Sequence, residues 1–161
     1  MKSVVIGHWS LVSFFGRLSC LLLVACCLLA CSLPNLEEAD CTQARDIVRE
    51  FYSFHFANDM HPTQENIRLR EKYLTHDYAT KLMHGEASVT PATKDLFTDS
   101  EDFPKAFRVG ECKVVEAGQN VQFKVLMFWK DDEKSQQKPV VAFVRKENDK
   151  WLIDSVSPLD K

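Results

Sequence analysis

Tyr52, His55 and Asp77 are the polar side chains of this 161-residue chain best placed for acid–base chemistry. A phenol, an imidazole or a carboxylate can transfer a proton when a cavity tunes its pKa. The first two fall on the inner face of one predicted helix, and Asp77 falls near the start of another. The predicted strand that would line the same cavity, Val121 to Trp129, contains no acid. These positions therefore favour a ligand-lining role over catalysis.

Trp129 is a further candidate for ligand contact. Phe128 and Trp129 precede the charged turn KDDEKSQQK, where they would reach a sheet edge or the mouth of a cavity. Burial in the core is the alternative, since aromatic residues are more often core than binding site. We therefore name Tyr52, His55, Asp77 and Trp129 as predicted ligand-binding residues.

The histidines do not have the spacing of a metal site. His55, His61, His76 and His84 are separated by six, fifteen and eight residues, and no Cys-x-x-Cys pair accompanies them. A helical metal site needs two ligands four residues apart on one face, so we expect no metal and no cofactor. An acidic cluster offers a weaker cation hypothesis, with an ordinary solvated surface as its alternative. The cluster comprises Asp95, Asp99, Glu101 and Asp102.

Residues 1–30 have the composition of an export signal. Lys2 and Arg17 are their only charges apart from His8, and Ser19 is the sole polar residue, cysteines aside, between Leu18 and Ala30. This apolar run is shorter than the roughly 20 residues that a membrane-spanning helix needs. We predict a cleaved signal; an ordinary secretory signal and an uncleaved anchor helix remain alternatives to a lipoprotein signal.

The end of this segment, Leu28-Leu29-Ala30-Cys31, resembles the lipobox of bacterial lipoproteins. The resemblance implies cleavage before Cys31 and lipidation of its sulfur. Cys26 ends a second match, but cleavage there would leave an apolar stretch at the mature terminus. Two or more acyl chains hold a protein stably on a membrane. With Ser32 after the cysteine, the resemblance implies a lipid anchor in the cell envelope, at the outer membrane and facing the periplasm.

Cys41 and Cys112 are the two cysteines left after the signal and Cys31 are set aside. In an oxidising compartment such a pair can form a disulfide, with two separate buried thiols as the alternative. No second cysteine lies near either one to resolve a mixed disulfide, so neither is predicted to be catalytic.

The charge of the mature chain excludes one class of partner. Without residues 1–30, eighteen basic and twenty-three acidic residues remain, a net charge of −5. Nucleic-acid binding requires a basic stripe, so we expect no nucleic-acid partner and no electrostatic docking on anionic lipid.

Helices come first in the mature chain. Apolar residues recur at three- and four-residue steps over 40–57, 63–74 and 76–83, which predicts three helices. A loop rich in Ser, Thr, Pro and acids follows from Gly85 to Pro104, with a short helix possible at 93–97. So long a loop hints at a ligand-facing segment.

Strands follow, because the apolar period changes to two after Lys105. We predict strands at 105–116, 120–131, 137–147 and 150–157, joined by hairpin-sized turns into an antiparallel meander. The fold class is therefore α+β, with amino-terminal helices packed on a curved four-stranded antiparallel sheet. We divide the chain into a signal (1–30), a tether (31–39) and one domain (40–161).

This order of elements resembles the cystatin-like, nuclear-transport-factor-like α+β roll, and KWLIDSV looks like its closing strand. More narrowly, ARDIVREFYSFHF, REKYLTHDYATKL, FRVGECKV and KWLIDSV resemble a family of small bacterial envelope lipoproteins with a domain of unknown function. The resemblance implies a fold and a location in the cell envelope, but it implies no activity.

Three functions are compatible with these observations. The first is a non-catalytic envelope protein that binds a protein partner or a small apolar ligand through the concave sheet face. The second is an enzyme of the isomerase or cyclase type that uses the same cavity. The third is an immunity-type or structural interaction protein that works through its surface. A filled cavity would argue against the enzyme and the small ligand.

Overall fold

The computed structural model describes residues 37–85, 94–130 and 135–159. The predicted signal, Cys26, Cys31 and most of the tether lie outside these ranges, so these assignments and the domain boundaries remain predictions. Among the described residues, no helix has both the length and the apolar character that crossing a membrane requires.

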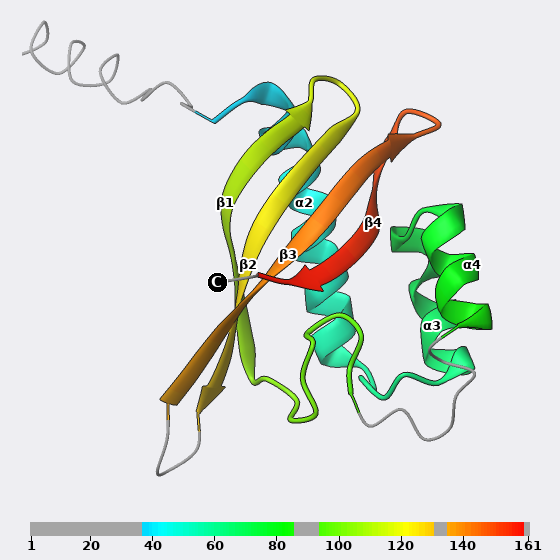
Figure 1. Ribbon diagram of the computed structural model, residues 1–161, viewed down its shortest axis with the longest axis vertical. Helices are drawn as coiled ribbons and strands as arrows, with labels where there is room; N and C mark the ends of the chain where they lie inside the picture. The colour runs from blue at the N-terminus through cyan, green and yellow to red at the C-terminus, as the bar shows by residue number, and fades with distance from the viewer. Residues whose placement is uncertain (1–36, 86–93, 131–134, 160–161) are drawn as a thin grey trace, which may run out of the picture. The chain divides into compact units, whose positions relative to one another are not determined.

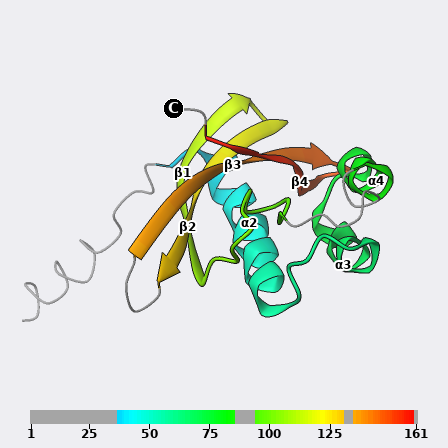
Figure 2. The same ribbon diagram turned by 60° about the horizontal axis from the view of Figure 1, so that its bottom comes forward.

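The observed elements follow the predicted order. The helices are α2 (Ala39–Ala57), α3 (Gln64–Arg70), the 3₁₀ turn η1 (Glu71–Tyr73) and α4 (His76–His84). The strands are β1 (Ala106–Glu116), β2 (Asn120–Lys130), β3 (Ser135–Glu147) and β4 (Lys150–Pro158). They form one antiparallel sheet in the order β1-β2-β3-β4, and α2 lies across one face of it (Figures 1 and 2). The predicted α+β class and meander are confirmed.

Two details differ from the sequence prediction. The second predicted helix tightens into the 3₁₀ turn η1 after Arg70 and ends at Tyr73. Residues 94–100 form a turn closed by a bridge between Asp95 and Ser100, in place of the short helix considered for 93–97.

The inner face of the sheet is filled by α2. The helix buries residues at three- and four-residue steps, which places them on one stripe. These residues are Cys41, Ala44, Val48, Phe51, Tyr52 and His55. They pack on alternate residues of the central strands, Val121, Phe123, Val125 and Met127 in β2 and Val140, Ala142 and Val144 in β3, all at most 1% exposed. The concave face therefore holds core side chains.

The chain reverses between strands where residues adopt a left-handed backbone. Gly118 has φ +72° in the β1–β2 turn, and Asn148 and Asp149 have φ 50° and 62° in the two-residue β3–β4 turn. A two-residue hairpin with both residues at positive φ matches the right-handed twist of its strands. Asp40 of α2 accepts a hydrogen bond from the Gly118 amide at 2.7 Å, which ties the start of the helix to the β1–β2 turn.

A bulge in β1 is held by the helix. The register shifts between Val109 and Cys112, and Arg45 of α2 donates to the carbonyls of Val109 (3.3 Å) and Gly110 (2.9 Å). Beside the bulge, Cys41 and Cys112 form a disulfide with Cα atoms 5.9 Å apart, which confirms the predicted pairing. The bond joins the first turn of α2 to β1.

The disulfide predicts a large loss of stability on its removal. It closes a loop across a sequence separation of 71 residues, for which the chain-entropy model gives about 4 kcal/mol. We expect Cys41→Ala/Cys112→Ala to lower the free energy of unfolding in urea by that order, and reduction of the parent protein to do the same. A change below about 1 kcal/mol in both measurements would contradict this account.

Candidate functional site

A buried polar network joins α2, α3 and the turn at 94–100. His55, Arg70, Asp95 and Thr98 are each at most 1% exposed. Arg70 Nε donates to His55 Nδ1 at 2.8 Å, and His55 Nε2 lies 2.9 Å from Asp95 Oδ2. Thr98 Oγ1 donates to the same carboxylate oxygen at 2.6 Å, and the Phe97 amide donates to Asp95 Oδ1 at 3.0 Å.

These contacts determine the tautomer of His55. A guanidinium has no acceptor, so Nδ1 must accept from Arg70 and carry no proton. The proton then lies on Nε2 and is donated to Asp95. A neutral imidazole thus bridges a cation and an anion, and the charges of Arg70 and Asp95 compensate each other across it.

Arg70 also donates to carbonyls of α3, of the last turn of α2 and of the segment between the two helices. Its Nη1 donates to Asn66 O at 2.6 Å, and its Nη2 donates to Asp59 O at 2.8 Å and to His55 O at 3.4 Å. Burial lowers the pKa of the Arg70 guanidinium, and the carboxylates of Asp95 and Asp59 oppose that shift. The side chain thereby holds the segment between α2 and α3 against the core.

Tyr52 lies in the same buried region. Its hydroxyl donates to the Phe97 carbonyl at 3.0 Å, and its side chain is fully buried. Burial raises the pKa of Tyr52 well above its usual value, and the neighbouring Tyr78 and Asp95 add to the shift. Tyr52 and His55 therefore have partners within the protein and expose at most 1% of their surface, while their ligand-binding role stays a prediction.

Asp77 and Trp129 lie elsewhere, on the surface. The Asp77 side chain is 80% exposed and pairs with Arg145 at 3.2 Å. Trp129 lines a groove of about 540 Å³ with Phe103, Lys105 and Gln137 among others. Its indole Nε1 donates to the Asp102 carbonyl at 2.7 Å. The four predicted ligand-binding residues thus do not converge on one site.

The acidic cluster does not form a shared cation site. Asp95 belongs to the buried network, while Asp99 pairs with Lys94 and Lys138. Burial tends to raise the pKa of Asp99, but the hydrogen bonds from Lys138 and Lys94 outweigh it and hold the pKa below its usual value. In the described part of the chain, one group of potential ligands does gather, Glu37 with Cys41 and Cys112, but the disulfide occupies both sulfurs.

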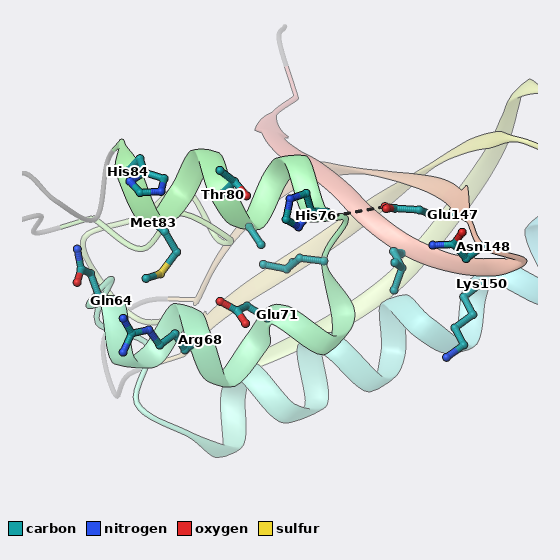
Figure 3. A pocket seen from close by; sticks show the side chains of 13 residues that line it. Gln64, Arg68, Glu71, His76, Thr80, Met83, His84, Glu147, Asn148 and Lys150 are labelled. Carbon is teal, nitrogen blue, oxygen red and sulfur yellow. Dashed lines mark hydrogen bonds between the residues drawn. The ribbon is translucent and has the colours of Figure 1, made fainter.

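The largest of the surface grooves described here lies between α3, α4 and the β3–β4 turn. It has a volume of about 750 Å³, and we name it the α3–α4 groove. Leu74, Ala79, Met83 and Leu152 supply its apolar lining. Its polar lining comprises Gln64, Arg68, Glu71, His76, Thr80, His84, Glu147, Asn148 and Lys150. Figure 3 shows Arg68 and Glu71 on one side and Thr80 and Met83 on the facing side.

α4 is held in place by contacts to the edge of the sheet. These contacts therefore also fix one wall of the α3–α4 groove. Thr75 precedes α4, and its amide donates to the Ile153 carbonyl of β4 at 2.9 Å. Its hydroxyl donates to Asp154 Oδ1 at 2.9 Å, and Arg145 lies 3.1 Å from the same oxygen. Glu147 in turn accepts from the His76 amide at 3.4 Å, the dashed line of Figure 3.

Sequence reasoning missed Arg70 and Thr98, and it considered Asp95 only as a member of the acidic cluster. Arg70 follows the buried Ile67 by three residues, so its place on the inner stripe of α3 was readable from helical spacing. Asp95 and Thr98 lie in a segment without periodicity, and no comparable signal places them in the core.

Comparison with known proteins identifies the fold. The chain matches no family model and no curated protein. It is similar to a chain of the type VI native effector–immunity complex Tae3–Tai3 from Ralstonia pickettii, with a TM-score of 0.55 and 16% identity over 73% of this chain and 95% of that one. Another similar structure is the Ntf2-like potential transfer protein TraM from the Gram-positive conjugative plasmid pIP501, with a TM-score of 0.47 and 10% identity over 74% and 97% of the two chains. At such low identity the first likeness shows the α+β fold alone.

The buried network predicts an asymmetric response to mutation. Asp95→Ala leaves the buried Arg70 cation without its counter-charge, which we expect to cost about 3–5 kcal/mol of unfolding free energy. Asp102→Ala, an exposed acid that follows the same turn, is the matched control and should change stability by less than about 0.5 kcal/mol. Urea unfolding at neutral pH measures both. Equal effects of the two substitutions would contradict a charge-compensating role for Asp95.

Proposed function

We propose that this protein is exported, anchored in the envelope through a lipidated Cys31, and binds a protein partner through its surface. The observation that supports binding at the surface is that core side chains fill the interior of the protein. Of the three acid–base candidates, Tyr52 and His55 are buried and Asp77 lies apart from them on the surface, and α2 fills the concave face of the sheet. Binding must therefore occur on the outside.

The α3–α4 groove is the site that we propose for this partner. Its lining alternates apolar side chains with charges of both signs, which suits a protein segment better than a small apolar ligand. Interfaces of this kind combine an apolar centre with a polar rim. The walls come from segments far apart in the sequence and are held by the contacts of Thr75 and Asp154, so the groove is preformed.

The comparison lends support to a protein partner. A chain of the same fold occurs in the effector–immunity complex from Ralstonia pickettii. We infer an immunity-type role as one specific form of the function, in which this protein binds another protein as a component of such a complex does. The isomerase or cyclase alternative gains no support from the described residues, because Tyr52 and His55 are buried.

The anchor follows from the sequence and has a direct test. We propose that the protein belongs with the small envelope lipoproteins that its sequence resembles and lies at the outer membrane, facing the periplasm. Intact mass spectrometry of protein extracted from membranes should show an acylated amino-terminal Cys31. Cys31→Ala should abolish acylation, whereas Cys26→Ala, the matched control, should leave it unchanged. Loss of acylation in Cys26→Ala but not in Cys31→Ala would assign the anchor to Cys26. An unmodified amino terminus at any residue other than cysteine would refute the lipid anchor.

Photo-crosslinking tests the groove. A benzoylphenylalanine at Thr80, inside the groove, should give an adduct with a second protein when the lipidated chain is irradiated in its own envelope. The same residue at Glu50, on the exposed side of α2, is the control and should give about tenfold less, because rim and remote positions contribute little to an interface. Equal yields from the two positions would contradict binding at the α3–α4 groove.

A further inference from the structure

The sheet has a second face that no described helix covers. α2 packs on the inner face, and α3 and α4 lie beside the β4 edge, so the outer face of all four strands is open toward the viewer in Figure 1 and uppermost in Figure 2. We call it the open sheet face. Residues directly opposite across a sheet share a face, so the strand register identifies its members.

The centre of the open sheet face is apolar. Leu126 of β2 is paired with Pro139 of β3, and the next β3 residues on this face are Val141 and Phe143. Phe128 extends the patch along β2. Each of these five side chains is partly exposed. A half-exposed apolar patch on two neighbouring central strands is larger than the scattered single residues of an ordinary surface, and such patches mark interaction sites.

Basic side chains surround that centre. Arg108 and Lys113 of β1 are paired with Leu126 and Gln122, and Lys124 of β2 is paired with Val141. The Arg108 guanidinium lies 5.9 Å from the centre of the Phe128 ring, which confirms that it faces this patch. Within the described part of the chain, no ion pair engages these three cations, whereas Arg145 on the same face is paired with Asp77 and Asp154.

This basic excess stands against the charge of the whole chain. Glu116 shares this face through its pairing with Asn120, but the three cations still leave the face basic, whereas the whole chain carries a net charge of −3. A surface of one sign on a protein of the other sign attracts and orients a partner of complementary charge.

The edge of the sheet is a less suitable docking place than the face. β1 has two register irregularities, and Arg45 already binds carbonyls at the first of them. Bulges of this kind prevent another strand from pairing with an edge. The β4 edge is bridged by Leu74.

We propose that the open sheet face docks an acidic surface of another protein, with Arg108, Lys113 and Lys124 pairing with carboxylates around an apolar contact. This surface is distinct from the α3–α4 groove and adds a second interaction site to the proposed function. A second copy of this chain is disfavoured, because two identical faces would bring Arg108, Lys113 and Lys124 of both copies together. A bilayer is disfavoured, because each of these apolar side chains is already partly buried among its neighbours on the sheet.

Crosslinking from the face tests the proposal. A benzoylphenylalanine at Gln122 of the lipidated chain, irradiated in its own envelope, should form an adduct with a protein other than this chain. Mass spectrometry should locate the adduct on that protein beside Asp or Glu residues. The yield should fall about tenfold between about 0.05 and 0.5 M salt, and about tenfold in Arg108→Glu/Lys113→Glu/Lys124→Glu. Arg108→Gln/Lys113→Gln/Lys124→Gln removes the same charges without reversing them and should lower the crosslinking yield by a smaller factor.

A matched control changes the same charge elsewhere. Arg49→Glu/Lys72→Glu/Lys81→Glu, at exposed residues outside both proposed surfaces, should alter the Gln122 yield by less than about twofold, and circular dichroism with thermal unfolding checks that every variant is folded. An adduct with a second copy, an adduct with phospholipid, or a yield that ignores the charge reversal would overturn the proposal. If Thr80 captures a protein and Gln122 captures none, the open sheet face fails and the proposed function stands. If neither position captures a protein, both fail.

Discussion

The hydrogen-bonded series from Arg70 through His55 to Asp95 is the constraint on which the packing of α2, α3 and the turn at 94–100 depends. A buried ion costs several kcal/mol unless a partner compensates its charge, and Arg70 meets its counter-charge only when α2, α3 and the turn at 94–100 come together. The same arginine satisfies three carbonyls at the end of α2 and beyond it. The network therefore specifies how these segments assemble, and it uses the groups that would otherwise suggest catalysis.

The other end of α2 is fixed by different means. The disulfide and the Arg45 contacts hold its first turns to the bulge of β1, and Asp40 holds the β1–β2 turn. With both ends attached, the apolar stripe of the helix lies along the inner face of the sheet and excludes water from it. Helix and sheet thus act as one body that presents surfaces of fixed shape.

The proposed function depends on which face of the sheet is covered by α2. α2 occupies the concave face of the sheet, so this face is part of the core. The contacts of Thr75 and Asp154 instead shape a groove outside the core. Among the described residues, the open sheet face combines an apolar centre with three cations that no ion pair engages.

The sequence by itself determined the class of fold and the strand meander, because helical and alternating apolar periods act over a few residues and are readable directly. It predicted the Cys41–Cys112 pair with two separate thiols as the alternative, and the structure decided for the disulfide. Only the tertiary structure decided the fate of the polar groups. His55 and Asp95 are forty residues apart, and whether such groups are solvated, catalytic or mutually compensated depends on which segments pack together. The burial of Tyr52, the exposure of Asp77 and the two sides of the sheet were settled in the same way, because burial is a property of the assembled core.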